Sequence, residues 1–271
     1  MSGTSKSGAA NRMSEVAARI HKEAEENDAI YGRRSLEILD LSKMHYGHAH
    51  MLEWALQNLP NLKGSRVLDI GIGEGQSSAL LARAGAHVTG IDVSVKGLER
   101  AQELAKRCGA KIDFKLMAGE ELRFEDASFD AVLCISAYHH MDLEKATREI
   151  ARVLRPGGRA VLIEPLATNP LAWIYRQFGK ILAREATSEE MPLRFRDLKF
   201  LRQHFHKVNW QGMFFLSVGL FGLERIWNNE IPLVKSFTKS MFRWVFTVDK
   251  LLLKIPGLQS IAWKIGIVAD R

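Results

Sequence analysis

The feature that most constrains this chain is a glycine-rich turn between a short apolar segment and a predicted helix. Residues 66–70, Arg-Val-Leu-Asp-Ile, predict a strand, and the turn Gly-Ile-Gly-Glu-Gly at 71–75 follows it directly. Glycines at such a turn let the backbone approach a ligand closely, at the positive end of the next helix. Asp92 follows a second predicted strand, 23 positions after Asp69. A carboxylate at that position fits the two hydroxyls of a ribose, so the chain is predicted to bind a ribose-containing ligand.

Strands and helices alternate around this turn. Five strands are predicted, at 66–70, 87–91, 111–117, 129–135 and 159–164. Helices are predicted between them, at 77–84, 94–107 and 143–154. Such alternation implies βαβ units, right-handed crossovers and a mostly parallel sheet. With two further strands predicted at 207–216 and 260–269, we expect an α/β fold with a doubly wound, mostly parallel sheet of seven strands.

The chain divides into four predicted parts. Residues 1–13 are expected to form a flexible tail, and residues 14–60 a helical cap that Pro60 ends. Residues 61–165 would form the ligand-binding core. Residues 166–271 would form a looser C-terminal part, with helices at 170–183 and 193–204, a helical insert at about 218–256 and the last strand at about 260–269.

Charge and aromatic residues are unevenly distributed along the chain. Residues 1–164 carry 22 Lys and Arg against 23 Asp and Glu, whereas residues 165–271 carry 16 against 8. Five of the six Trp and ten of the thirteen Phe also lie after residue 164. A basic, aromatic segment fits an anionic membrane surface, nucleic acid or an acidic partner. An ordinary core with a solvated Lys and Arg face is the other interpretation.

Cysteine content and hydropathy bear on location. Two cysteines, Cys108 and Cys134, exclude a disulfide framework and suggest a reducing compartment. The longest strongly apolar run, Met213–Leu223, covers 11 residues, whereas a membrane helix needs about 17–25. The first ten residues lack the apolar core of a secretory signal. We expect a cytoplasmic protein, with a peripheral position at the membrane as an open possibility.

Two details separate the glycine turn from a dinucleotide site. Its glycines have the spacing G-x-G-x-G, whereas a dinucleotide-binding turn has G-x-G-x-x-G. An acidic residue, Asp69, precedes the first glycine by two positions. A carboxylate at that place would crowd a pyrophosphate, but it suits a cationic amine.

On these motifs the sequence resembles the class I S-adenosylmethionine-dependent methyltransferases. The matching segments occur in the family's order, from about residue 64 to 165. They are Val67–Gly75, Gly90-Ile-Asp92, Phe124–Ala131, His139-His140 and Arg152–Gly158. The set is most similar to the small-molecule branch that includes quinone and sterol methyltransferases. The resemblance implies a Rossmann-like fold, S-adenosyl-L-methionine as cofactor, and methyl transfer to a hydrophobic small molecule or lipid-like acceptor by in-line displacement.

The resemblance also assigns cofactor contacts. At the methionine end would lie Asp69 and the turn residues Gly71, Ile72, Gly73 and Gly75, and Ser136 could touch this end through its backbone. Asp92 would accept both ribose hydroxyls. Val93 would pack on the adenine, whose edge would be lined by Ala118, Gly119 and Glu120. Family members often have Asp where Ala118 stands. Either Glu120 replaces that acceptor for the adenine amino group, or backbone atoms suffice.

His139 and His140 are the candidate catalytic residues. They follow the fourth strand, and ligands of open α/β sheets bind outside the carboxyl ends of the strands. Either imidazole could take a proton near neutral pH. The alternative is that His140 only bonds a neighbouring loop and that His139 packs. Weaker candidates for contacts with the acceptor or a lid are Tyr31, Tyr46, Tyr138 and Glu164.

No metal site is predicted. His45, His48 and His50 are close in sequence, but their spacing does not place three ligands on one helix face. The nearest carboxylates, Asp40 and Glu53, complete no ligand spacing that we recognise.

Residues 233–255 predict a basic amphipathic helix. Its apolar residues recur at three- and four-residue steps: Phe237, Met241, Trp244, Val245, Val248, Leu251, Leu252 and Ile255. Its polar side carries Lys235, Lys239, Arg243, Lys250 and Lys254, with Asp249 as the only acid. Such a helix can lie in an anionic membrane interface. Alternatively it is a lid that covers an apolar acceptor pocket.

Two further functions stay open on the sequence. RNA methylation is supported only by the basic C-terminal part, because Ser136-Ala-Tyr-His139 stands where an Asn/Asp-Pro-Pro-aromatic loop would be expected. Nucleic acid is therefore not an expected partner. A non-catalytic, membrane-associated binding protein on the same fold is the other alternative. The oligomeric state is not predicted.

Overall fold

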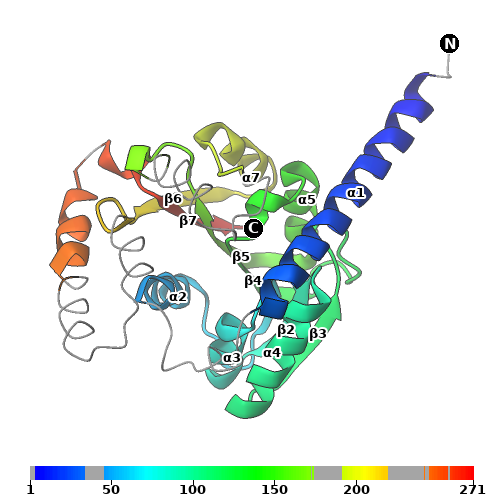
Figure 1. Cartoon of the computed structure of the whole chain (residues 1–271), viewed down its shortest axis with the longest axis horizontal. Coiled ribbons are helices and arrows are strands. Elements are labelled where there is room, and N and C mark those ends of the chain that lie inside the picture. Colours follow the sequence, from blue (N-terminus) through cyan, green and yellow to red (C-terminus); the bar gives the residue numbers. More distant parts are fainter. Residues whose placement is uncertain are drawn as a thin grey trace.

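The computed structural model describes residues 4–33, 46–171, 173, 191–218, 241, 244–255 and 257–271. Within these residues a seven-stranded sheet has the order β3-β2-β1-β4-β5-β7-β6 (Figure 1). Its strands are β1 (Arg66–Ile70), β2 (His87–Asp92), β3 (Ile112–Leu116), β4 (Phe129–Ile135), β5 (Leu154–Pro165), β6 (Lys207–Met213) and β7 (Lys264–Asp270). β7 runs antiparallel to β5 and β6, and the pairs among β1–β5 are parallel. The predicted fold class is confirmed.

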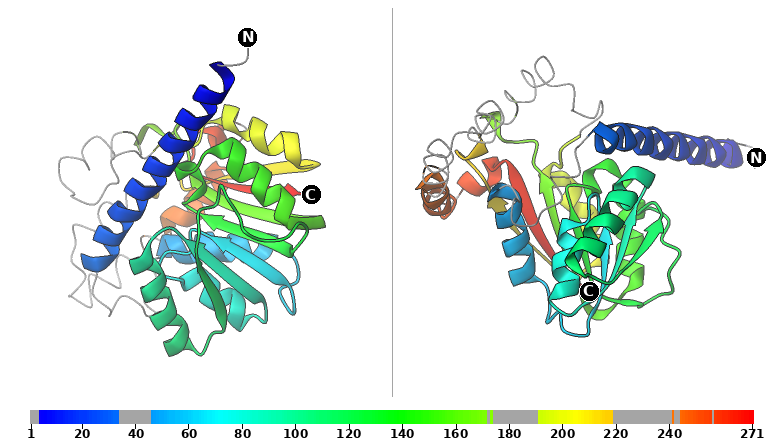
Figure 2. Two further views of the ribbon diagram at one scale, coloured as in Figure 1. Left: turned by 90° about the vertical axis from the view of Figure 1, so that its right-hand side faces the viewer. Right: turned by 60° about the horizontal axis from the view of Figure 1, so that its bottom comes forward.

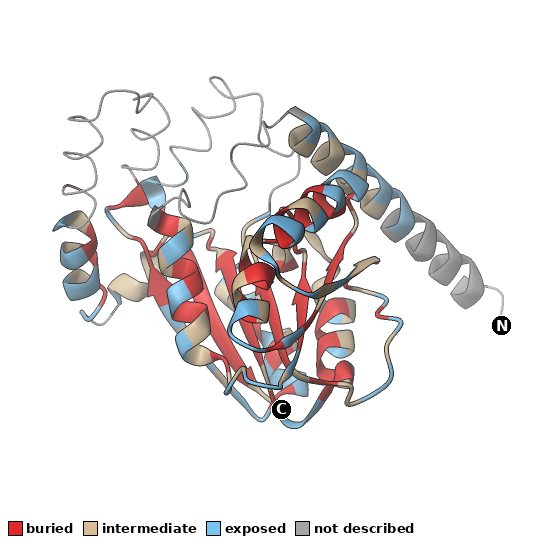
Figure 3. Cartoon of the chain, turned by 90° about the horizontal axis from the view of Figure 1, so that it is seen from below, coloured by how far each residue is buried: buried red, intermediate tan, exposed pale blue. Residues whose placement is uncertain are grey.

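Helices cover both faces of the sheet, as the burial pattern in Figure 3 shows. α2 (Tyr46–Asn58), α3 (Gln76–Arg83) and α4 (Val95–Cys108) belong to one face, and α5 (Leu143–Val153) and α7 (Leu198–His204) to the other. The strands are apolar on both sides because each face is covered by helices. Leu68 and Val132, for example, face α5, whereas Val67 and Leu133 face α2.

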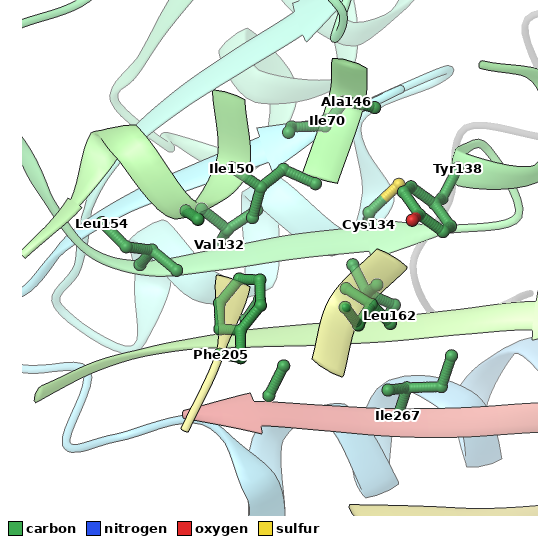
Figure 4. Close-up of a cluster of buried hydrophobic side chains, with 14 of the residues drawn as sticks. Ile70, Val132, Cys134, Tyr138, Ala146, Ile150, Leu154, Leu162, Phe205 and Ile267 are labelled. Atoms are coloured by element: carbon green, nitrogen blue, oxygen red, sulfur yellow. The ribbon is translucent and has the colours of Figure 1, made fainter. Parts of the chain in front are cut away.

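The larger apolar cluster lies between the sheet and α5 with α7 (Figure 4). Ile150 of α5 and Leu162 of β5 are fully buried in it. Truncation of such a side chain to alanine costs about 2–5 kcal/mol. This cluster therefore fixes the strands whose carboxyl ends carry the candidate site.

The N-terminal helix differs from the prediction. α1 spans Thr4–Arg33, so the predicted flexible tail at residues 1–13 is helical from Thr4 onward. Once a helix has nucleated, each added residue costs little, and the Ala- and Glu-rich segment that follows supplies the nucleus. The C-terminal end of α1 crosses α4, and the N-terminal half of α1 extends beyond the rest of the molecule (Figures 1 and 2).

Several element ends also differ from the prediction. The helix expected at 143–154 ends at Val153, and β5 then begins at Leu154, earlier than the predicted 159–164. Phe195–Asp197 form a 3-10 turn ahead of α7, within the helix expected at 193–204. The last strand begins at Lys264, because residues 258–261 form a 3-10 turn. The helix predicted at 170–183 and most of the insert at 218–256 lie outside the described residues.

The sixth strand was expected to reach residue 216, but β6 ends at Met213. Phe214 has a φ of 59°, which turns the chain out of the sheet. The N–H groups of Phe215, Leu216 and Ser217 then donate to the Asp249 carboxylate at 2.8–3.1 Å. The turn is therefore held from outside the sheet, by the helix over residues 244–252.

That helix buries a different set of residues from the one expected. Phe246, Asp249 and Leu253 face inward, whereas Trp244 and Leu251 are 69% and 59% exposed. Asp249 was expected on the solvated polar side. It is buried because it accepts the three N–H groups of the turn and the Ser217 hydroxyl.

We predict that Asp249→Ala destabilises the protein by about 2–4 kcal/mol, because four donors, two of them on the buried Ser217, lose their charged acceptor. Urea unfolding monitored by tryptophan fluorescence measures the change. Lys250→Ala, the exposed neighbour, serves as the control and should lie within about 0.5 kcal/mol of the parent protein. Equal stabilities of the two variants would refute the role of this contact.

Candidate active site

Asp69 lies at the carboxyl end of β1 and is 2% exposed. Its carboxylate accepts a hydrogen bond from Ser78 Oγ of α3 at 2.7 Å. Burial raises the pKa of Asp69 to about 7; the Ser78 bond lowers it and the nearby Asp92 raises it further. A cationic group arriving beside this carboxylate would restore its charged form.

The glycine turn after β1 has a conformation that side chains resist. Gly71, Gly73 and Gly75 all have positive φ, between 53° and 80°. A Cβ at Gly71 would lie 2.2 Å from Ala137 Cβ, and one at Gly75 would lie 2.8 Å from Ala101 Cβ. The turn therefore touches the loop that follows β4, which places the predicted cofactor turn beside the predicted catalytic residues.

Asp92 ends β2 and is held by the same turn. Its two carboxylate oxygens accept from Gly73 N and Ser94 N, each at 2.8 Å. Burial raises the pKa of Asp92, and these hydrogen bonds oppose the rise. The carboxylate is thus fixed in direction beside Gly73, with Val93 half-buried next to it.

The amides of the turn are committed to the fold. Gly71 N and Ile72 N both donate to the carbonyl oxygen of Ile91, at 2.9 and 3.0 Å. Ile72 in turn packs over Gly90, where a Cβ would lie 2.2 Å from Ile72 Cδ1. What this turn can offer a cation is therefore its carbonyl oxygens, together with Asp69.

The predicted adenine edge follows β3. Ala118 is half-buried, and Gly119 is buried against Met141. Glu120 accepts from Asp142 N at 3.0 Å and from the guanidinium of Arg19. Glu120 thus lies at this edge, and its carboxylate is already bonded to Arg19 of α1.

α1 contributes residues that sequence reasoning missed. Arg19 donates to Glu120 and to the carbonyl of His140, so α1 bridges the loops after β3 and β4. Asp28 accepts from Ser94 Oγ at 2.6 Å and from Lys96 N at 2.9 Å, at the start of α4. The i, i+4 pair Arg19 and Glu23 was a signal in the sequence, but the docking of α1 was not.

Tyr31 lies over the glycine turn, and its role in a lid stays a prediction. A Cβ at Gly73 would lie 2.8 Å from its hydroxyl, and one at Gly97 would lie 3.0 Å from its ring. Tyr46 begins α2, but its side chain lies outside the described residues.

Glu164, fully buried at the end of β5, organises the loop after β4. Its Oε1 accepts from Ala137 N at 3.2 Å and Tyr138 N at 3.0 Å, while its Oε2 lies 2.5 Å from His139 Nδ1. A hydrogen bond from Nδ1 to the carboxylate leaves Nε2 as the nitrogen that can accept a proton. The residue predicted as a weak acceptor contact is therefore placed behind His139.

His140 packs against His139, with ring centroids 3.9 Å apart and ring planes tilted by 41°. Burial lowers the pKa of His140 to about 4, with His139 adding to the fall, so this ring is neutral near pH 7. The guanidinium of Arg19 donates a hydrogen bond to the backbone carbonyl of His140, not to its ring.

Two other predicted residues take structural positions. Tyr138 is 1% exposed, and its hydroxyl lies 2.5 Å from Thr147 Oγ1 of α5, inside the core rather than at the acceptor side (Figure 4). Ser136 has a φ of 57° and donates its N–H to Ile163 O at 2.8 Å, so that amide cannot serve the methionine end.

The described residues show neither a cluster of metal ligands nor a membrane-spanning helix. In the described residues no three His, Cys, Asp or Glu side chains gather as metal ligands; His45 lies outside them. The helices of the described segments are each too short or too polar to traverse a bilayer.

Glu23 gives α1 a pH dependence that can be measured. Burial raises its pKa to about 7, with Glu120 and Asp92 adding to the rise and Arg19 opposing it. An acid whose pKa is raised on folding stabilises the fold at low pH, and that stabilisation is lost as the pH rises from about 4.5 to about 7.

We predict that the parent protein loses up to about 3 kcal/mol relative to Glu23→Gln over this pH range. Unfolding free energies of both proteins, measured by urea titration at each pH, give the difference. A difference that stays constant with pH would show that Glu23 does not titrate at this site. Glu25→Gln, which alters an exposed residue of the same helix, is the control.

Residues 68–162 match the family model of the methyltransferase domain. Ubiquinone biosynthesis O-methyltransferase from Bordetella avium is 34% identical over 142 residues, which cover 52% of this chain and 58% of that protein. 27-O-demethylrifamycin SV methyltransferase from Amycolatopsis mediterranei is 43% identical over 108 residues, or 38% of this chain and 40% of that protein. The chain thus spans little more than half the length of the first of these relatives and less of the second.

Among solved structures, the chain resembles geranyl diphosphate C-methyltransferase from Streptomyces coelicolor, solved with Mg²⁺, geranyl diphosphate and S-adenosyl-L-homocysteine. The TM-score is 0.56 at 16% identity, over 85% of this chain and 81% of that one. At this identity the likeness shows the fold alone.

Proposed function

We propose that this chain, whose residues 68–162 match the methyltransferase domain, is a class I S-adenosylmethionine-dependent methyltransferase that transfers a methyl group to a hydrophobic small-molecule or lipid-like acceptor. The observation that carries the proposal is the placement of two buried carboxylates, Asp69 and Asp92, on either side of one glycine turn. The same turn contacts the loop of His139 through Ala137.

The residues present fit S-adenosylmethionine. Its methionine end carries an ammonium, which suits Asp69 and the carbonyl oxygens of Gly71 and Gly73, since the amides of this turn are engaged elsewhere. Its ribose diol suits the fixed carboxylate of Asp92. When bound, the cofactor supplies a sulfonium methyl that is already activated for displacement. The protein's task is then to align the acceptor and to exclude water.

His139 is proposed as the general base. Glu164 holds its Nδ1 at 2.5 Å, which fixes the ring and stabilises the imidazolium that forms when Nε2 takes the acceptor's proton. His140 packs on that ring in the neutral form. We place Glu164 as a positioning residue, because it acts through His139 and through the loop that carries it.

An aromatic wall, in which Phe214 and Phe246 are buried and Trp263 is half-buried, supports a hydrophobic acceptor that would rest on the Trp263 ring. Phe214 packs edge-on against Phe246 and Trp263, with centroids 5.2 and 6.0 Å apart. His50 joins it at 4.6 Å from Phe246, and burial lowers the pKa of His50, so this wall carries little charge. The similarity to enzymes named for ubiquinone biosynthesis and for a rifamycin points to the same class of acceptor.

The helix over residues 244–252 is proposed to dock on an anionic membrane surface. Trp244 and Leu251 are exposed on one face, with Lys250 exposed beside them, while Phe246 and Asp249 anchor the opposite face. Exposed aromatic and aliphatic side chains among lysines are typical of helices that lie in a membrane interface. A peripheral, cytoplasmic location follows from this proposal.

RNA methylation remains the weaker alternative. Two relatives similar to this chain are named for ubiquinone biosynthesis and for 27-O-demethylrifamycin SV, and neither name refers to RNA. A non-catalytic binding protein would need neither the fixed direction of Asp92 nor the His139–Glu164 pair.

We predict that S-adenosylmethionine raises the melting temperature of the parent protein by mass action, and that Asp92→Ala and Asp92→Asn weaken its binding by about 100-fold. Isothermal titration calorimetry measures the affinities. Asp113→Ala, which removes an exposed carboxylate from β3, should bind as the parent protein does. Absence of any binding at millimolar cofactor would overturn the proposed function, and unchanged affinity in both Asp92 variants would overturn the ribose assignment.

We predict that the protein sediments with vesicles containing phosphatidylglycerol and that added salt weakens the binding. Trp244→Ser should lower the partition coefficient about tenfold, because one large apolar side chain is lost from the interface. Leu116→Ser changes an exposed leucine on β3 and should have no effect. Failure to sediment at low salt would leave this helix as a lid only.

A further inference from the structure

Lys264 is the first residue of β7 and is only 8% exposed. β7 is antiparallel to β5 and pairs Lys264 with Pro165, the last residue of β5. Its start therefore lies at the edge where the parallel strands end, which is the edge of the candidate active site. From there Lys264 Nζ donates to Ser136 Oγ, just past β4, at 2.5 Å.

Ser136, whose hydroxyl oxygen accepts the hydrogen bond from Lys264, has an unusual backbone conformation. Its φ of 57° is costly for a residue with a side chain, and such strain persists where the surroundings impose it. Ser136 begins the loop that leads to His139. Glu164 accepts a hydrogen bond from this loop at Ala137 N, and its other carboxylate oxygen lies 2.5 Å from His139 Nδ1. The ammonium of Lys264 is therefore fixed next to the loop of the proposed base.

The aromatic wall reaches the same place. Lys264 Nζ lies 5.7 Å from the centroid of the Trp263 ring, and Trp263 is half-buried against Phe214. A flat acceptor that rests on the half-buried Trp263 ring would bring one edge to the ammonium. In such a low-dielectric position, charge attraction is far stronger than in water.

We propose that Lys264 binds an anionic oxygen of the acceptor, supplied either by an ionised acidic hydroxyl or by a carboxylate beside the methylated atom. This inference rests on the proposed function and names the chemistry of its acceptor. It makes Lys264 a residue that determines specificity, because a neutral acceptor of the same shape forgoes the charge attraction.

The two sources of the oxygen differ in the reaction. If it belongs to the hydroxyl that is methylated, His139 takes the hydroxyl proton and Lys264 holds the oxyanion. That oxygen then bonds to the methyl carbon as the carbon–sulfur bond breaks, and the sulfur keeps the electron pair. If it belongs to a carboxylate, Lys264 contributes to binding and alignment only.

A purely structural role would give a different pattern. If Lys264 only held Ser136 in place, its loss would disturb the loop for every acceptor alike. Probes that share a ring but differ in charge therefore separate the two roles. We choose 4-nitrocatechol for the acidic hydroxyl, 4-nitrobenzoate for the carboxylate and 4-nitroanisole as the neutral member.

The test is equilibrium dialysis of each probe with the full-length protein saturated with S-adenosyl-L-homocysteine, at a pH where 4-nitrocatechol ionises. The parent protein should bind at least one anion about 10- to 100-fold more tightly than 4-nitroanisole. Lys264→Met should lose that preference and keep its affinity for 4-nitroanisole, whereas Lys264→Arg should retain much of the preference. If 4-nitrocatechol is the favoured probe, its absorbance should also show a lowered pKa in the complex that Lys264→Met abolishes.

The matched control is Lys207→Met, which removes an exposed lysine at the other end of the β6–β7 pair and should change nothing. Preference for 4-nitrocatechol alone assigns the hydroxyl, and preference for 4-nitrobenzoate assigns the carboxylate. The proposal is wrong if the parent protein favours neither anion, or if Lys264→Met weakens all three probes equally. Binding of S-adenosyl-L-homocysteine, measured in the same samples, tests the proposed function separately.

Discussion

The arrangement of the site depends on one buried carboxylate, that of Glu164. It lies at the end of β5, out of contact with solvent. It accepts hydrogen bonds from two backbone amides of the loop after β4, and it is hydrogen-bonded to the ring of His139. Without this acceptor the donors would be left in a low-dielectric interior, which is costly. The same loop touches Gly71, so the carboxylate also helps to position the loop of the proposed base against the glycine turn.

The sequence predicted those parts of the site that depend on local chain geometry. Asp69 and the three glycines lie within seven residues of one another, and a βαβ unit returns Asp92 to the same turn, where it accepts from Gly73 N. Their roles toward the cofactor stay predictions. Strand existence was predicted well because it also depends on local chain geometry. Strand ends were less accurate, because Phe214 and Asp249 end β6 through a contact between distant segments.

The parts that were missed depend on tertiary docking. Arg19 and Asp28 act only because α1 lies across the loops after β3 and β4 and the start of α4, and no local pattern announces that placement. Asp249 was expected in water because it stood among lysines, yet three turn amides draw it into the interior. Tyr138 follows the fourth strand, as a site residue would. The positive φ of Ser136 and the hydrogen bond from Tyr138 N to Glu164 direct its side chain toward α5.

The place of β7 in the sheet has a consequence for biosynthesis. It lies between β5 and β6, although it follows both in the chain. As the polypeptide leaves the ribosome, β6 emerges before the strand that must separate it from β5. Until β7 arrives, the edge of β5 stays open, and an open edge invites wrong pairing. The sheet is thus completed by insertion of β7 between two strands that precede it in the chain.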